Sequence, residues 1–360
     1  MTKQPNFLAL ADGSVFYGVS CGAPVDTVGE AVFNTGMTGY QEIISDPSYA
    51  GQIVTTSTAE VGNYGCNHDD MESRQLFLNG LIVQSMNRAS NFRSEEELTD
   101  LLKRFGKPCL HSIDTRRLVL HLREHGAQKA FIHGSDSSIS EQDAIAQAKA
   151  WEGLDGQDYA ARVSNPVAYD WNTQGDYFVV AYDFGIKYNI LRCMEASGMR
   201  VHVVPSNTSA QDVLKLKPNG VFLSNGPADP SAVKGAIEAA KHLVGKVPLM
   251  GICLGHQIIG LACGAKTERL KFGHHGCNHP VKNLLDNSIE ITSQNHNFTI
   301  VPNSIPKSLE LTHINLNDNT VEGLRHLTEP VFCVQYHPEA GPGPHDSLYL
   351  FQQFKTLMAR

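Results

Sequence analysis

The chain has 360 residues, of which 41% are hydrophobic, and this length exceeds what one hydrophobic core usually organises, so we expect two domains. The formal net charge is −8, and the chain lacks a long basic run, a signal-peptide pattern and a membrane-length apolar stretch, which argues against nucleic-acid and membrane partners. The eight cysteines are scattered along the chain, which is typical of reduced thiols in a cytoplasm and not of a disulfide-stapled domain.

The first part of the chain combines short strand-like segments with later helices. Apolar runs of strand length lie between glycine, proline and asparagine residues at 7–10, 52–57 and 80–83. Such runs indicate strands bounded by turns. Together with the helices described next, they predict an N-terminal α/β domain over residues 1–150.

Three helices are expected later in this domain, at residues 95–103, 115–124 and 140–150. Ser94 and Glu97 have the spacing of a capping box at the start of the first helix. Gly126 follows the second helix as a stop signal. Ser140 is placed to cap the third.

A regular alternation of strands and helices distinguishes the rest of the chain. Residues 151–175 contain glycine, asparagine, aspartate and proline without a clear hydrophobic period, so we interpret them as a linker. From 176 to 360 the alternation predicts a doubly wound, mostly parallel sheet. The expected strands are 177–182, 200–204, 220–223, 247–252 and 331–335, and the expected helices are 189–197, 210–215, 232–244 and one starting near 256.

The strongest chemical signal is Gly251-Ile252-Cys253-Leu254-Gly255, between an apolar strand and an apolar helix. This is the thiol counterpart of a nucleophile elbow, in which small residues two positions either side of the nucleophile allow a sharp turn. A helix N-terminus favours the thiolate, and the N–H of Leu254 is placed to bind an oxyanion. The alternative is that Cys253 is a small buried hydrophobe, as most free cysteines are. The two glycines favour the nucleophile.

A candidate base follows the last apolar strand, where His337, Pro338 and Glu339 are consecutive. If this strand lies beside the one before Cys253, the imidazole can take the thiol proton and later protonate a leaving amine. Glu339 would orient the ring through its other nitrogen. Taken alone, the three residues are equally consistent with a turn at a strand end.

Three further segments invite a functional interpretation. Residues 224–230 follow an apolar strand as a tight loop, which is either structural or a source of further oxyanion donors. Residues 271–280 are rich in glycine and histidine, but no second ligand arm accompanies them, so we expect a loop and no metal site. Residues 260–267 differ from a phosphate-binding loop at Ala265, where glycine is required, so no ATP site is expected in this chain.

These motifs resemble a known family. Gly-Ile-Cys-Leu-Gly-His-Gln at 251–257 and His-Pro-Glu at 337–339 resemble class I glutamine amidotransferases. Gly-Glu-Ala-Val-Phe-Asn-Thr-Gly-Met-Thr-Gly-Tyr-Gln-Glu at 29–42 and Asp-Pro-Ser-Tyr at 46–49 resemble the N-terminal domain of carbamoyl-phosphate synthase small subunits. Shorter matches lie at 113–116, 182–190, 272–276 and 294–296, so the resemblance spans nearly the whole chain.

The resemblance implies a catalytic set and a glutamine pocket. The catalytic residues would be Cys253, His337 and Glu339. The residues expected to line the glutamine pocket are Ser48, Gly226, Ala228, Leu254, Gln257, Asn295, Asn297 and Phe298. Ala228, Asn297 and Cys277 stand where the family usually has glycine, and a positive φ would disfavour Ala228 by about 1 kcal/mol or more.

The function that the resemblance implies is hydrolysis of glutamine through a Cys253 thioester. The ammonia would pass to a large synthetase subunit, which binds ATP and magnesium and makes carbamoyl phosphate for arginine and pyrimidine synthesis. Two other functions stay open: a binding module that has lost turnover, and a different glutamine-cleaving enzyme such as a γ-glutamyl peptidase. The catalytic residues argue against the first, and the N-terminal resemblance argues against the second.

Overall fold

The computed structural model describes residues 5–227 and 229–359, and the chain divides into two units, Met1–Leu154 and Asp155–Arg360. Residues 155–175, which were expected to lie in a linker, fall within the second unit and contain α5 (Tyr159–Val163) and β10 (Tyr169–Asp170). Among the described residues, no helix has the length and apolar character needed to cross a membrane.

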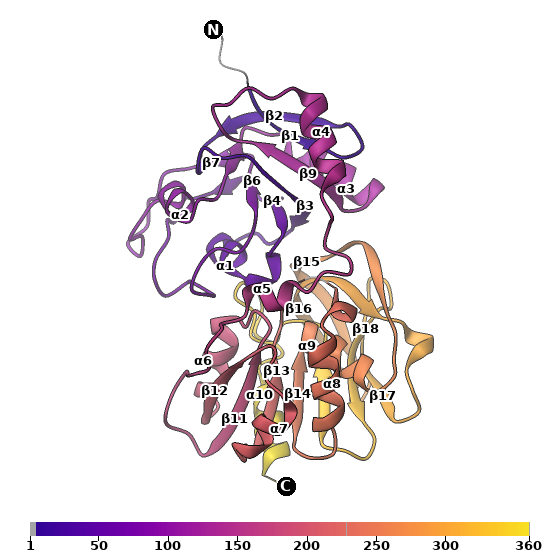
Figure 1. Ribbon diagram of the computed structural model, residues 1–360. Coiled ribbons are helices and arrows are strands. Elements are labelled where there is room, and N and C mark those ends of the chain that lie inside the picture. The colour runs from indigo at the N-terminus through magenta and orange to yellow at the C-terminus, as the bar shows by residue number, and fades with distance from the viewer. Residues whose placement is uncertain (1–4, 228, 360) are drawn as a thin grey trace. The chain divides into compact units, whose positions relative to one another are not determined.

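The first unit is built on a closed barrel with strand order β1-β2-β8-β6-β4-β3-β9 (Figure 1). The three neighbouring pairs β3–β4, β4–β6 and β6–β8 are parallel and the other pairs are antiparallel. Closing the sheet removes the unpaired edges that an open sheet would expose. The barrel strands are β1 Asn6–Leu10, β2 Val15–Ser20, β3 Thr27–Asn34, β4 Gln52–Thr56, β6 Gly80–Ile82, β8 Cys109–His111 and β9 Gln128–His133; β5 Glu60–Val61 and β7 Ser85–Met86 form a separate pair.

The helices of this unit test the expected capping signals. Gly126 ends α3 with a positive φ of 91°, and the Ser140 side chain caps α4, so both predictions are confirmed. The prediction for Ser94 is wrong, because α2 begins four residues later, at Leu98. Residues 95 and 96 donate their backbone N–H groups to Cys66 O instead, which holds them in extended pairing. The helices are α1 Tyr40–Ser45, α2 Leu98–Arg104, α3 Thr115–His125 and α4 Glu141–Ala150, with a 3-10 turn η1 at Pro47–Tyr49.

The second unit contains a 10-stranded sheet with order β10-β12-β11-β13-β14-β19-β18-β17-β15-β16. The central strands β12, β11, β13, β14 and β19 pair in parallel, as predicted from the alternating pattern. These strands are β11 Tyr177–Asp183, β12 Met199–Pro205, β13 Gly220–Leu223, β14 Leu249–Ile252 and β19 Val331–Val334. The helices are α6 Tyr188–Ala196, α7 Ala210–Lys215, α8 Lys234–Leu243, α9 Leu254–Ala262 and α10 Tyr349–Met358, with 3-10 turns η2 Pro230–Ala232 and η3 Pro302–Ser304.

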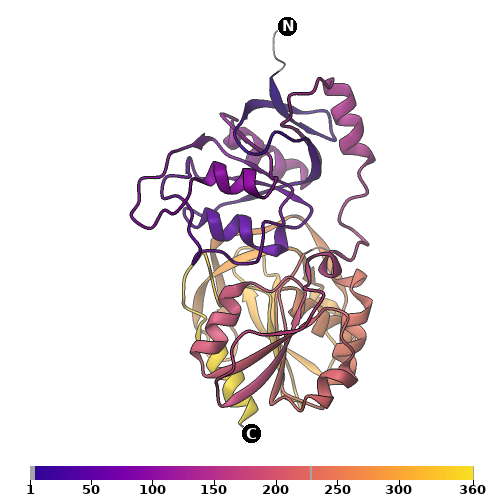
Figure 2. The ribbon, with the colours of Figure 1, turned by 60° about the vertical axis from the view of Figure 1, so that its left-hand side comes forward.

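Alternate residues of the central strands face two different helical layers (Figure 2). In β11, Val180 and Tyr182 pack with α7, α8 and α9, whereas Val179 and Ala181 pack with α6 and α10. Because side chains alternate across a strand, near-continuous apolar runs bury both faces of such a sheet. The doubly wound prediction is therefore confirmed for the central strands.

An antiparallel extension completes the sheet beyond β19. Its strands are β15 Thr267–Asn283, β16 Ile289–Ile300, β17 Leu309–Asn315 and β18 Val321–His326. Residues 271–280, which were expected to form a loop, belong to β15, so that prediction is wrong. Register shifts at 269–274 and 276–279 accommodate its glycines, which is why the sequence carries no clean strand alternation.

Candidate active site

Cys253 occupies the turn between β14 and α9 with a strained backbone, φ 54° and ψ −105°. A non-glycine residue with this geometry persists only where the surrounding structure enforces it. A Cβ atom on Gly255 would lie 2.0 Å from Leu223 O, and one on Gly251 would lie 2.7 Å from the Gly255 backbone. The two glycines are therefore required for the sharp turn that lifts Cys253 to the carboxyl edge of the sheet.

His337 reaches the same edge because β14 and β19 are parallel neighbours, with Ile252 opposite Val334. The backbone N–H of Cys253 donates to Val334 O at 2.9 Å, and that of His337 donates to Ser293 O at 2.9 Å. The adjacency of the two strands, expected from the sequence, is thus observed.

Glu339 orients His337 through a short hydrogen bond. His337 Nδ1 donates to Glu339 Oε1 at 2.7 Å, and both side chains are almost wholly buried. Burial lowers the pKa of His337, but attraction to Glu339 and interactions with the Cys253 side chain outweigh burial and raise the pKa to about 10. Because His337 Nδ1 donates to Glu339, the interaction with Cys253 involves the other ring nitrogen, Nε2. A proton that Nε2 takes from the thiol is therefore held firmly, because the resulting imidazolium lies between the Glu339 carboxylate and the ionised sulfur.

Lys187 completes this set, and the sequence reasoning did not single it out. Lys187 Nζ lies 3.1 Å from Glu339 Oε1 and donates to Ala340 O, while its side chain is only 4% exposed. Burial raises the pKa of Glu339, but the charges of Lys187 and His337 outweigh burial and lower it to about 2. The available signal was a lysine in the turn after an apolar strand, and lysine is almost never buried without a partner.

Residues 224–227, after β13, pack against the nucleophile turn. Ser224 O accepts the backbone N–H of Gly255 at 3.0 Å, and Asn225 Oδ1 accepts that of Lys187 at 3.1 Å. A Cβ atom on Gly226 would lie 2.3 Å from Phe184 O, so no side chain fits there. These contacts fix the loop beside the first turn of α9, where the amide of Leu254 is among those with no intrahelical acceptor.

The second strand of the extension, β16, brings Asn295, Asn297 and Phe298 to the site. The Cys253 thiol donates to Asn295 O at 3.5 Å. His275 contacts Asn295 Oδ1 at 2.9 Å and Asn297 Oδ1 at 3.0 Å through its two ring nitrogens. Asn297 has no positive φ, so its position does not require a left-handed backbone.

Gln257, on the first turn of α9, forms hydrogen bonds with β16 and with the residue after β19. Its Nε2 donates to Phe298 O at 2.7 Å and to Gln335 Oε1 at 2.9 Å. The side chain is 3% exposed. Gln257 thus fixes the backbone at Phe298 relative to the nucleophile helix.

Two expected site residues, Ser48 and Ala228, and the glycine departure Cys277 remain. Ser48 is a buried residue of η1 in the first unit, where its N–H donates to Asp46 Oδ1. Ala228 lies outside the described residues. Cys277 is half-buried on β15, and its thiol donates to Pro342 O at 3.4 Å.

This arrangement can perform nucleophilic catalysis. It combines a thiol on a strained turn at a helix N-terminus, a buried imidazole with a raised pKa and a carboxylate held ionised by a lysine. Such a set activates a sulfur nucleophile and returns a proton to a leaving group. The backbone amides beside the sulfur are suited to an oxyanion.

The comparisons with known proteins agree with this chemistry. The family model for glutamine amidotransferase class-I matches residues 180–357, and the model for the carbamoyl-phosphate synthase small chain, CPSase domain, matches residues 8–132. The carbamoyl phosphate synthase small chain of Chlorobaculum tepidum is 50% identical over 367 residues, covering 100% of this chain and 99% of that one. That of Akkermansia muciniphila is 48% identical over 363 residues, covering 98% and 97%, respectively. The small chain of Aquifex aeolicus is 48% identical over 370 residues, covering 99% of both chains. The chain therefore belongs to the carbamoyl phosphate synthase small chain family.

Proposed function

We propose that the chain hydrolyses glutamine to glutamate and ammonia, with Cys253 as nucleophile, His337 as base and acid, and Glu339 as the residue that orients His337. The observation that carries the proposal is the buried series Lys187–Glu339–His337 beside a cysteine on a strained strand-to-helix turn. Each member of the series determines the charge of the next, and the last one faces the sulfur.

The reaction begins when the thiol proton moves to His337 Nε2 and the sulfur attacks the side-chain amide carbon of glutamine. The carbonyl oxygen becomes an oxyanion next to the amide of Leu254 and the loop at Gly226. Collapse of this intermediate breaks the C–N bond, and His337 gives the proton to the leaving ammonia. Water then attacks the thioester by the reverse proton path and releases glutamate.

The same proposal assigns the glutamine pocket to the backbone and side chains around the sulfur. Gly226, Leu254, Gln257, Asn295, Asn297 and Phe298 form its part in the second unit, and Ser48 and Ala228 keep the role that the family resemblance implies. The thiol in its resting position donates to Asn295 O at 3.5 Å. Substrate binding must turn the thiol toward His337, and such tightening of catalytic hydrogen bonds is common when substrate binds.

The partner in this proposal is a large synthetase subunit that receives the ammonia. The name small chain, carried by the relatives, supports a larger partner. That partner would bind ATP and magnesium and use bicarbonate to make carbamoyl phosphate for arginine and pyrimidine synthesis, while no cofactor takes part in the chemical steps of glutamine hydrolysis in this chain. The eight free cysteines support a reducing, cytoplasmic setting.

The test is glutamate release from glutamine by the purified chain, alone and with its large subunit. Cys253→Ser is the matched control, because serine keeps the size of the side chain and removes the thiol. Partner-stimulated release that disappears in Cys253→Ser supports the proposal. No release from folded and associated protein would refute it and favour a non-catalytic binding module. Release without any carbamoyl phosphate from the complex would favour a different glutamine-cleaving enzyme.

A further inference from the structure

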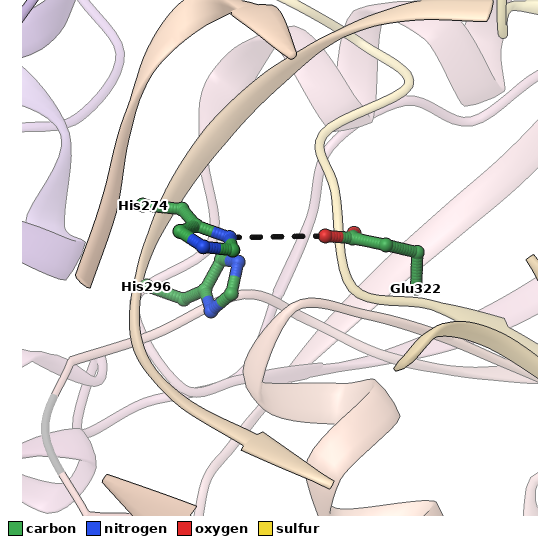
Figure 3. A group of neighbouring side chains, drawn as sticks. All are labelled: His274, His296 and Glu322. Atoms are coloured by element: carbon green, nitrogen blue, oxygen red, sulfur yellow. Dashed lines mark ion pairs between the residues drawn. The ribbon is translucent and has the colours of Figure 1, made fainter. Parts of the chain in front are cut away.

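A second group of buried titratable side chains lies apart from the catalytic residues. His274 on β15, His296 on β16 and Glu322 on β18 point toward one another, and their ligand atoms all lie within 4.8 Å (Figure 3). None of the three is more than 7% exposed. The three strands come from different parts of the sequence, so this group exists only in the folded chain.

Hydrogen bonds determine which ring nitrogen of His274 carries a proton. His274 Nε2 lies 2.8 Å from Asp318 Oδ2, and an ionised carboxylate can only accept, so Nε2 is the protonated nitrogen. Nδ1 has no hydrogen-bond partner among the described residues and lies 3.9 Å from Glu322 Oε1. In the neutral ring, Nδ1 thus presents a lone pair to a carboxylate.

The same reasoning applies to His296. His296 Nδ1 lies 2.8 Å from the backbone oxygen of Phe298, which can only accept, so Nδ1 carries the proton. Nε2 then presents its lone pair to Gln294 Oε1 at 3.0 Å. Rotating the Gln294 amide resolves this contact only when Glu322 is protonated, because the amide oxygen would then face Glu322 Oε2, to which Gln294 Nε2 now donates at 3.1 Å.

Glu322 is fully buried, and the hydrogen bonds it accepts come from neutral groups. Asn315 Nδ2 donates to Oε1 at 3.0 Å and Gln294 Nε2 donates to Oε2 at 3.1 Å. A buried carboxylate without a cation is costly. Burial raises the pKa of Glu322 to about 7. With both rings neutral, two imidazole lone pairs and this carboxyl group converge on one place, and no described residue there supplies a positive charge.

We propose that His274, His296 and Glu322 bind a single divalent transition-metal ion of the zinc type. Two neutral imidazoles and one carboxylate are a recognised zinc ligand set, and Asp318 and the Phe298 carbonyl are the outer-shell acceptors that usually fix such ligands. Zinc bonds of about 2.0 Å place ligand atoms about 3.3 Å apart. The ligand atoms, which lie within 4.8 Å of one another, must therefore approach by up to about 1.5 Å to close the set. The histidine-rich segment 271–280 lacks a second ligand arm in sequence, and β16 and β18 supply it in the fold.

The metal would tie together the strands that carry part of the glutamine pocket. His296 lies between Asn295 and Asn297, and its Nδ1 donates to Phe298 O. If the proposed glutaminase function holds, metal removal raises KM for glutamine several-fold with little change in kcat. Metal binding itself does not depend on the glutaminase function. It can therefore be measured even if the chain has no glutaminase activity.

The experiment uses the full-length chain, stripped with a chelator and titrated with ZnCl2 and, separately, with CoCl2. Metal content, calorimetry and the visible spectrum of bound Co²⁺ are recorded for wild type, Glu322→Gln, His274→Gln and Asp318→Asn. His202→Gln is the matched control, because His202 also contacts an aspartate, Asp170, at 2.7 Å, but on another strand. Thermal melting of each variant verifies folding.

The expected result is one metal ion per chain, held by the three side chains and one water, with tetrahedral Co²⁺ bands that lack a thiolate charge-transfer band. Glu322→Gln and His274→Gln should weaken binding at least about 100-fold, and Asp318→Asn about 10- to 100-fold, while His202→Gln binds as wild type. If folded wild-type protein binds no stoichiometric metal, the proposal is overturned. The positive charge at this group would then come from a proton. A thiolate band, or unchanged binding in both ligand variants, would overturn the proposal as well.

Discussion

Replacing Glu339 with glutamine tests whether its negative charge drives the chemistry. The 2.7 Å bond from His337 Nδ1 to Glu339 is charge-assisted and buried. Such bonds are worth about 1.5–3 kcal/mol, which corresponds to a roughly 10- to 150-fold fall in kcat for Glu339→Gln. The pKa of His337, about 10 in the wild type, should also fall, because attraction to Glu339 is the main effect that opposes burial. The alkaline limb of the activity profile should therefore move to lower pH.

The assay is glutamate release as a function of pH by the chain with its large subunit, together with urea unfolding. Glu339→Gln also leaves the buried charge of Lys187 unpaired, which costs about 3–5 kcal/mol of stability. The double variant Glu339→Gln/Lys187→Met should recover much of that stability but not the rate. Glu290→Gln, which changes a buried carboxylate that accepts from Tyr336 and Tyr349, is the control. Wild-type kcat and an unmoved alkaline limb in Glu339→Gln would refute this account of His337.

Three further predictions concern stability and charge. Lys187→Met alone should cost about 3–5 kcal/mol in urea unfolding, because it breaks a buried ion pair and leaves a carboxylate behind. Gly255→Ala should lose at least about 3 kcal/mol and all measurable glutaminase activity, since its Cβ would lie 2.0 Å from Leu223 O. Because folding raises the pKa of His337 from 6.5 to about 10, its stabilisation is complete below the lower value and is lost as pH rises through the higher one. Alkaline unfolding should therefore be steeper in wild type than in His337→Gln.

Each of these three predictions has a matched control and a result that would contradict it. Lys241→Met removes an exposed ion pair with Glu238 and should change stability by less than about 1 kcal/mol. A Cβ on Gly235, in α8, would meet no atom within 4 Å, so Gly235→Ala should be tolerated. Equal losses for both lysine variants, an active Gly255→Ala protein, or parallel alkaline unfolding with and without His337 would contradict the corresponding prediction.

Several elements could be predicted from local sequence because their signals are local. The strands at 220–223 and 331–334 are apolar runs, and Ser140 and Gly126 mark helix ends by their own side chain or backbone conformation. The capping box at Ser94 failed because Cys66, distant in sequence, takes the backbone groups that the helix needed. Local patterns are reliable where no distant partner competes for the same backbone groups.

The barrel and the antiparallel extension were not foreseen. β3 and β9 pair across about 100 residues of sequence, and no local pattern specifies such a register. The histidine-rich segment was expected to be a loop because its glycines and register shifts interrupt the alternation of β15. Only its pairing with β16 identifies it as a strand.

The sequence alone determined two features: the glycine-flanked nucleophile motif around Cys253, and the alternation of strands and helices that places Cys253 at a strand end. Both depend only on residues that are close in sequence. Only the tertiary structure decided which buried charges meet: Lys187 with Glu339, and His274 with His296 and Glu322. The physical reason is that a charge or a lone pair is stabilised by whatever lies a few ångströms away, and sequence separation does not determine that distance.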